Sequence, residues 1–167
     1  MTDENAKKRP GQIILAWWSA ELGDRKTGAQ KALSARLRRG DDVTVLCQPS
    51  VHDLAQKLAL RNGARLARLV RILAHVREHQ AQRLPRLLGR GDPKTMSPMR
   101  FERLVHSDGA DLEAAIRRAM PMVGHSANVA HLGEAVLFWS DKTRTGWCFD
   151  YYGGEAPFSD TSKEFVQ

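Results

Sequence analysis

The most specific chemical pattern in the sequence is H-V-R-E-H at residues 75–79. Histidines four residues apart lie on one face of a helix, so His75 and His79 can bind Zn²⁺ with Glu78 as a general base, as in the H-x-x-E-H motif of inverted zinc metalloproteases. The arginines around this stretch repel a divalent cation, and no motif marks a downstream acidic ligand. We therefore expect no metal site, with a zinc hydrolase as an alternative.

No other combination of residues predicts catalysis. Residues 89–91 (Gly-Arg-Gly) lack the spacing and the Lys-Ser/Thr ending of a phosphate-binding loop. The two cysteines, Cys47 and Cys148, form no disulfide or four-cysteine zinc pattern, and no serine lies in a nucleophile motif. The paired aspartates lie at helix edges, where capping explains them. The sequence therefore predicts a protein that is not an enzyme and needs no cofactor.

Positive charge is the stronger signal. The chain has 26 Lys and Arg against 19 Asp and Glu, a net charge of +7. Eleven of the basic residues and only three acidic ones lie between Arg61 and Arg103. This concentration favours a polyanionic partner. On a helix expected over 64–79, six basic residues fall opposite a Leu/Val stripe: Arg61, Arg65, Arg68, Arg71, His75 and His79. The alternative is a solvated arginine face.

Other basic residues can be explained either by nucleic-acid binding or by contacts within the chain. Lys31, Arg38 and their neighbours share the helix expected over 28–39, where they suit phosphate contacts or the negative end of the helix dipole. Arg117 follows Glu113 by four residues and can pair with it, whereas Arg118 has no such neighbour. The four tryptophans can stack on bases, but their helical spacing among aliphatic residues favours core packing.

The elements that carry these residues read as helices throughout, with no convincing strand. Apolar residues recur at helical spacing, and Ser50, Ser97 and Asn128 are expected helix N-caps. Residues 43–47 are expected to be an extended linker or the start of a helix. The expected helices cover residues 12–22, 28–39, 50–60, 64–79, 98–106, 111–122, 129–140 and 143–152.

The sequence thus predicts an all-α fold of two small helical bundles packed as one elongated subunit. An N-terminal bundle over 12–80 and a C-terminal bundle over 97–152 flank a linker at 81–96 that is rich in Arg, Pro and Gly, and residues 153–167 form an acidic tail. The start of the chain lacks signal-peptide order, and its apolar run at 13–18 is too short to span a membrane. We therefore expect a cytoplasmic protein.

Three stretches, in this order, resemble the CasB family, the small subunit of the type I-E CRISPR Cascade complex. The first is Trp17-Trp18 with DRKTG at 24–28 and KALSARLRRGDD at 31–42. The second is SPMRFERLVHSDGADLEAAIRRAM at 97–120, and the third is NVAHLGEAVLFWSDKTRTGWCFDYYG at 128–153. The segment at 81–96 and the acidic tail depart from the family pattern.

The resemblance implies a non-catalytic subunit of an antiviral defence complex that self-associates as a pair. Its partners would be the backbone and large protein subunits of Cascade, the guide RNA and the target DNA. The alternative is a free-standing helical regulator that binds DNA or RNA, although no clear helix-turn-helix is present. Together, the charge pattern and the family's basic positions give the expected nucleic-acid-binding residues: Lys31, Arg36, Arg38, Arg39, Arg65, Arg68, Arg100, Arg103, Arg117, Arg118, Lys142 and Arg144.

Overall fold

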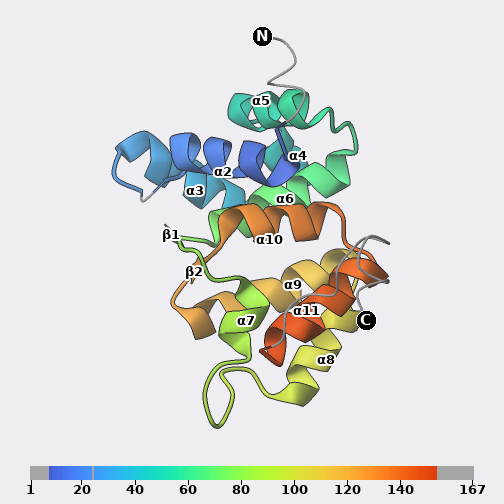
Figure 1. Cartoon of the computed structure of the whole chain (residues 1–167). Helices are drawn as coiled ribbons and strands as arrows, with labels where there is room; N and C mark the ends of the chain where they lie inside the picture. Colours follow the sequence, from blue (N-terminus) through green and yellow to red (C-terminus); the bar gives the residue numbers. More distant parts are fainter. Residues whose placement is uncertain (1–7, 24, 154–167) are drawn as a thin grey trace.

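The chain folds almost entirely into helices (Figure 1), which confirms the expected all-α class. The computed structural model describes residues 8–23 and 25–153. The N-terminal half contains five helices within these residues: α2 (Pro10–Glu21), α3 (Gly28–Arg39), α4 (Asp42–Leu46), α5 (Pro49–Leu58) and α6 (Gly63–Ala74). The expected acidic tail lies almost wholly outside the described residues.

Side-chain caps define several of these helices. Thr27 and Gln30 form a reciprocal capping box at the start of α3, and Asn62 accepts a hydrogen bond from the backbone N–H of Arg65 at the start of α6. Asp41 caps α4, so residues 43–47 begin a helix and are not an extended linker. The expected N-cap at Ser50 is wrong: Pro49 takes the first helical position of α5, and Gln48 precedes it.

The helix expected over 64–79 ends five residues early, at Ala74. Residues beyond it find backbone partners elsewhere, because the N–H of Arg77 donates to the carbonyl of His125 at 2.8 Å. Strand β1 (Glu78–His79) then pairs in parallel with β2 (Ser126–Ala127), which corrects the expectation of no strands. Two residues per strand give too little alternation to be visible in the sequence.

The C-terminal half contains α7 (Leu84–Leu88), α8 (Pro98–His106), α9 (Gly109–Ala119), the 3₁₀ turn η1 (Met120–Val123), α10 (Val129–Leu137) and α11 (Asp141–Tyr151). The expected N-caps at Ser97 and Asn128 are confirmed, since each side chain accepts a hydrogen bond from the backbone N–H three residues later. Pro121 lies in η1, where α9 gives way to a tighter turn. Helix α10 stops three residues before its expected end at Ser140.

The segment 81–96 carries a buried helix. The side chains of Leu84, Leu87 and Leu88 in α7 are buried, and α7 packs against α11. Gly89 ends α7 so close to α11 that an added Cβ would lie 1.8 Å from the carbonyl oxygen of Tyr151. Glycine is therefore required at this contact, and the segment is docked against α11.

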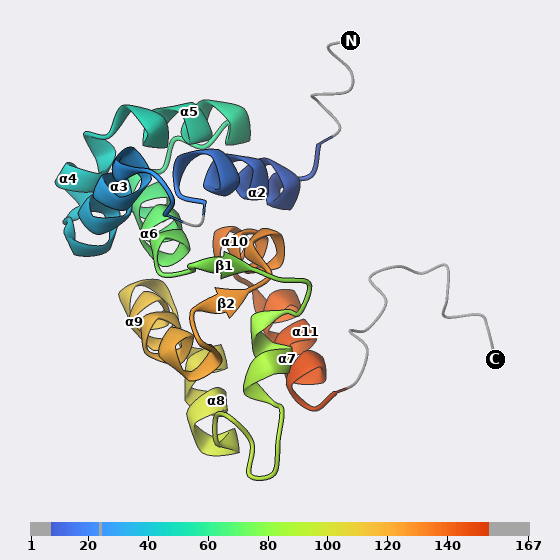
Figure 2. The same ribbon diagram turned by 90° about the vertical axis from the view of Figure 1, so that its left-hand side faces the viewer.

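Helix α10 joins the two halves of the chain, because it packs against both α2 and α6 (Figure 2). At the crossing, Gly133 lets α10 approach Ile14, and the backbone N–H of Gly11 donates to Glu134 at 3.2 Å. Three tryptophans are buried, at positions 17, 18 and 147, and Trp139 is half-buried. Core packing, not base stacking, therefore accounts for the tryptophans.

Candidate nucleic-acid interface

Helices α3, α9 and α8 follow one another down one side of the molecule, on the left of Figure 2. A pocket of about 730 Å³ lies at the upper junction, where the end of α3 meets α4, α6 and α9. Arg38 and Arg39 line it from α3, and Arg117 lines it from α9. The fold thus brings the adjacent pair Arg38 and Arg39 together with Arg117, which lies about 80 positions later in the sequence.

Buried neighbours set the direction of these arginines. On α3 the side chains of Ser34 and Leu37 face the core, which leaves Arg39 exposed at the end of the helix. The Nε of Arg38 donates to the carbonyl of Ser34 at 3.3 Å. On α9 the residues Leu112, Ile116 and Ala119 are buried, so that Arg117 and Arg118 lie on the solvent side. Amphipathic patterning therefore positions the basic residues on both helices.

The carboxylates of this pocket are engaged within the chain. Asp41 accepts hydrogen bonds from the backbone and side chain of Thr44, which lower its pKa. Arg71 bridges Asp42 at 2.7 Å and Glu113 at 3.0 Å. Burial alone would lower the pKa of Arg71, but these two carboxylates outweigh it and the pKa is raised. Arg117 lies 3.9 Å from Glu113, which already pairs with Arg71.

A second pocket, of about 280 Å³, lies below the first between α8 and α9. Arg100 and Arg103 line it from α8, Arg118 lines it from α9, and no acidic residue does so. Together, seven arginines and three carboxylates line the two pockets. We call this the α3/α9/α8 basic surface, with six predicted residues: Arg38, Arg39, Arg100, Arg103, Arg117 and Arg118.

The half-buried His75 lies near several of these arginines. The pKa of His75 is lowered to about 4, first by burial and then by the nearby charges of Arg117, Arg38, His125 and Arg25. Like charges around a titratable group disfavour its protonated form. His75 therefore stays neutral at physiological pH, beside a group of arginines that the fold holds close together.

Four of the other predicted residues are scattered. Lys31 is exposed on α3 outside both pockets, and Arg36 lies beside Arg39 in a neighbouring hollow. Arg68 is half-buried on α6, while Lys142 lies near the start of α11 in a separate cavity with Arg83. Arg36 adjoins the α3/α9/α8 basic surface through Arg39, whereas Lys31, Arg68 and Lys142 line neither of its two pockets.

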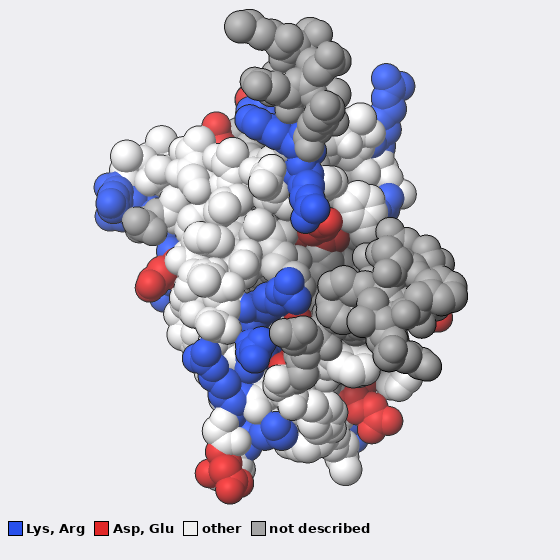
Figure 3. Space-filling model, viewed as in Figure 1, with Lys and Arg blue, Asp and Glu red and all other residues white. Residues whose placement is uncertain are grey.

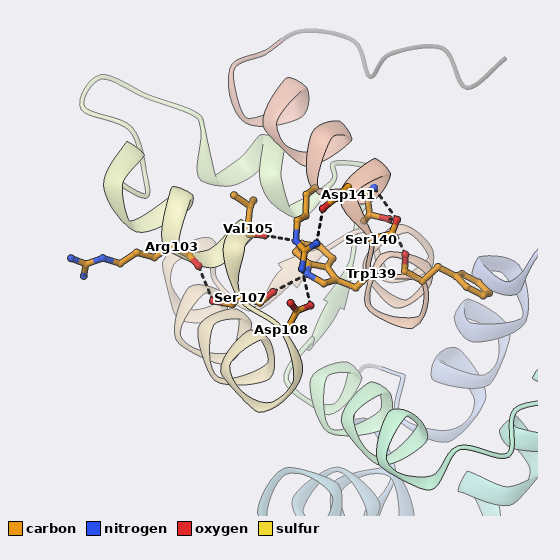
Figure 4. A network of polar contacts seen from close by, with 10 residues as sticks. Arg103, Val105, Ser107, Asp108, Trp139, Ser140 and Asp141 are labelled. Atoms are coloured by element: carbon orange, nitrogen blue, oxygen red, sulfur yellow. Dashed lines mark hydrogen bonds and ion pairs between the residues drawn. The ribbon is translucent and has the colours of Figure 1, made fainter. Parts of the chain in front are cut away.

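Arg65 and Arg144 make interactions inside the chain. Arg65 donates to the carbonyl of Leu137, across the packing of α6 against α10. The Nε of Arg144 donates to the carbonyl of Val105 at 2.7 Å, and its two terminal nitrogens bind Asp108 at 2.7 Å and Asp141 at 2.9 Å (Figure 4). The guanidinium also lies 5.6 Å from the ring centre of Trp139. These contacts tie α8 to α11.

Basic residues outside the predicted set cluster on another face. Figure 3 shows Lys and Arg side chains gathered over α7 and the loop that follows it. Arg83 on this segment is paired with buried Asp150 at 3.4 Å, whereas Arg86 and Arg90 are exposed. The charge count over 61–103 signals this segment, but only the fold shows that it faces away from α3.

The zinc alternative loses its geometric basis, because α6 ends at Ala74 and His79 lies in β1. The Nδ1 of His79 accepts the backbone N–H of Val129 at 3.1 Å. Within residues 8–23 and 25–153, no group of three or more His, Cys, Asp or Glu side chains is arranged to hold a metal ion. No helix in the same part of the chain is long and apolar enough to cross a membrane.

Comparison with known proteins identifies the family. The model of the CRISPR-associated protein Cse2 family matches residues 33–152, which include α8, α9 and all of α3 except its first five residues. No curated protein and no solved structure gives a significant match. Because the family model covers well over half of the 167 residues, the chain belongs to the Cse2 (CasB) family, whose members are small subunits of type I-E Cascade complexes.

Proposed function

We propose that this Cascade small subunit grips the phosphate backbone of nucleic acid on the α3/α9/α8 basic surface. The observation that carries the proposal is the convergence of six arginines from three helices, five of which make no ion pair within the described residues. Arginine and backbone phosphate form charge-assisted, often bidentate hydrogen bonds. Phosphates would supply the counter-charges that the fold does not.

Such a grip does not depend on base sequence, which suits a complex in which the guide RNA reads the target by base pairing. We propose guide RNA and target DNA, on its target strand or its displaced strand, as the ligands. The backbone and large subunits of Cascade are the proposed protein partners, with a second copy of this chain beside the first. Cse2 proteins are structural subunits, and we propose a non-catalytic role in antiviral defence here too.

A charge-reversal experiment tests the surface. The double variant Arg39→Glu/Arg118→Glu removes one arginine from each pocket, and both residues are exposed. We expect single-stranded DNA to bind this variant at least about ten-fold more weakly, with a smaller slope of log K against log salt, because each phosphate contact contributes about 0.7 to that slope. Fluorescence anisotropy between about 50 and 200 mM salt measures both quantities.

The matched control is Lys57→Glu/Arg61→Glu, which makes the same change of charge at two exposed residues near α5. It should bind nearly as well as the unmodified chain. Equal loss in both double variants would mean that net charge alone attracts DNA and would remove the case for this surface.

Purification of the tagged chain from its native host tests the partners. A stoichiometric complex that carries RNA of uniform guide length supports the Cascade assignment. Recovery of the chain alone, or with DNA only, would favour the free-standing nucleic-acid-binding regulator.

A further inference from the structure

A groove of about 810 Å³ runs between α8 and α11. It adjoins the second basic pocket along α8, where a terminal nitrogen of Arg103 lies 4.0 Å from the sulfur of Met99. Residues four or three apart on each helix form its walls, for example Met99, Glu102 and His106 on α8, and Thr145 with Cys148 on α11. The stacked rings of Phe101 and Tyr151, 4.0 Å apart, hold the two helices together beneath it. The groove is therefore a built feature of the packing of α8 against α11.

Apolar side chains in the groove are open to solvent. Met99 is 66% exposed and Tyr152 is 65% exposed, and both line it together with Pro98 and Val105. Large exposed apolar side chains that gather in one hollow mark interaction surfaces more often than isolated ones do. An elongated hollow of this kind suits the apolar face of a helix.

The rim of the groove is acidic, although the chain as a whole carries +7. Its charged lining consists of Glu102, Asp108 and Asp141 against the single arginine Arg144, with His106 beside them. Lys94 lies 5.4 Å from the ring centre of Tyr152, which follows the end of α11, so the acidic part of the groove is the part near the start of α11. Arg144 is already held by Asp108 and Asp141 (Figure 4), and Glu102 forms no ion pair within the described residues. This charge repels phosphate and attracts a cationic partner.

We propose that the α8–α11 groove is a docking site for a cationic amphipathic helix of another protein. The apolar face of that helix would cover Met99 and Tyr152, and its Lys or Arg residues would face Glu102, Asp108 and Asp141. The chain's own end is a poor occupant by charge, because residues 154–167 contain three acidic residues and one lysine. The groove adjoins the α3/α9/α8 basic surface along α8, and the test below therefore includes competition with single-stranded DNA.

The test uses the full chain and a fluorescent 18-residue peptide designed as a helix with Leu on one face and Lys and Arg on the other. A matched peptide carries Glu in place of each Lys and Arg. At about 150 mM salt, where only close charges interact strongly, we expect the cationic peptide to bind and the acidic peptide to bind at least about ten-fold more weakly. Equal binding of the two peptides would overturn the proposal.

Two substitutions locate the peptide on the chain. Met99→Asp places a charge on an apolar wall of the groove, and Glu102→Lys reverses the charge of a neighbouring residue. Each should weaken binding of the cationic peptide at least about ten-fold. The controls are Val43→Asp, at a residue 71% exposed on α4, and Asp53→Lys, at an exposed residue on α5. Circular dichroism checks that each variant is folded. Equal loss in the test and control variants would overturn the proposal.

Other occupants give different outcomes. If single-stranded DNA displaces the peptide in the Arg39→Glu/Arg118→Glu background, nucleic acid occupies the groove and the proposal fails. If the chain alone sediments as a dimer that Met99→Asp dissociates, the groove belongs to a second copy and the proposal of a different protein fails. A monomer, or a dimer unaffected by Met99→Asp, together with peptide binding that DNA leaves unchanged, supports the proposal.

Discussion

Arginines at the junction of α8 with α11 and arginines on the α3/α9/α8 basic surface have the same chemistry but different surroundings. Arg144 at the junction has a hydrogen bond to a main-chain carbonyl, two carboxylates and an aromatic ring around its guanidinium. Arg118 on the surface is exposed and shares its pocket with Arg100 and Arg103. The first kind of arginine holds helices together, and the second kind is available to a polyanion.

The sharpest case of an internal arginine is Arg71, whose side chain is 15% exposed and bridges Asp42 and Glu113. We expect Arg71→Met to lower the free energy of unfolding by about 3 kcal/mol, because buried Glu113 loses its 3.0 Å partner and keeps only the longer contact with Arg117 at 3.9 Å. Urea denaturation measures the change. The double variant Arg71→Met/Glu113→Gln should recover about half of the lost unfolding free energy. If this double variant is less stable than Arg71→Met alone, the explanation is contradicted.

The substitution Arg144→Gln should lower the free energy of unfolding by about 2 kcal/mol, since the carbonyl of Val105 loses its charged donor and Trp139 loses its cation. Asp108 and Asp141 are 74% and 99% exposed, so their ion pairs add little. Thermal and urea denaturation measure this loss. The folded variant should bind DNA almost normally. A ten-fold loss of affinity with unchanged stability would mean that Arg144 binds nucleic acid and does not mainly hold the helices together.

The triple variant Arg100→Gln/Arg103→Gln/Arg118→Gln should show the opposite behaviour. Its free energy of unfolding should change by less than about 0.5 kcal/mol, because these side chains form no ion pairs within the described residues. The slope of log K against log salt for single-stranded DNA should fall by up to about 2, as three phosphate contacts are lost. Destabilisation without any change in slope would show that these arginines stabilise the fold and do not bind phosphate.

A smaller effect links Arg117 to His75. The pKa of His75 is lowered to about 4, first by burial and then by nearby charges, of which Arg117 has the largest effect. Arg117→Gln should raise the pKa of His75 toward its ordinary 6.5, and an NMR titration of the imidazole measures it. Arg118→Gln is the control and should leave it unchanged. Because the folded pKa lies below the unfolded value, the unfolded chain binds the extra proton, and stability falls as pH decreases from about 6.5 to 4. Arg117→Gln should make this fall shallower.

Much of the fold could be predicted from the sequence, because helical periodicity and the caps at Ser97 and Asn128 are local signals. The end of α6 could not be predicted, because the residues after it form backbone hydrogen bonds with His125, about 50 residues later in the sequence. The same limit applies to the candidate site. Basic residues on α3, α8 and α9 could be named individually, but whether an arginine lies beside a carboxylate or in the open depends on tertiary packing, as Arg144 and Arg118 show.

The central claim is that the arginines of the α3/α9/α8 basic surface, and not the internal ones, bind nucleic acid. An NMR titration of the arginine Nε–H signals with a short single-stranded DNA tests it most directly. We predict that the signals of Arg39, Arg100, Arg103 and Arg118 shift on binding while those of Arg71 and Arg144 remain in place. Shifts confined to Arg71 and Arg144, or to the arginines around α7, would contradict the assignment of this surface.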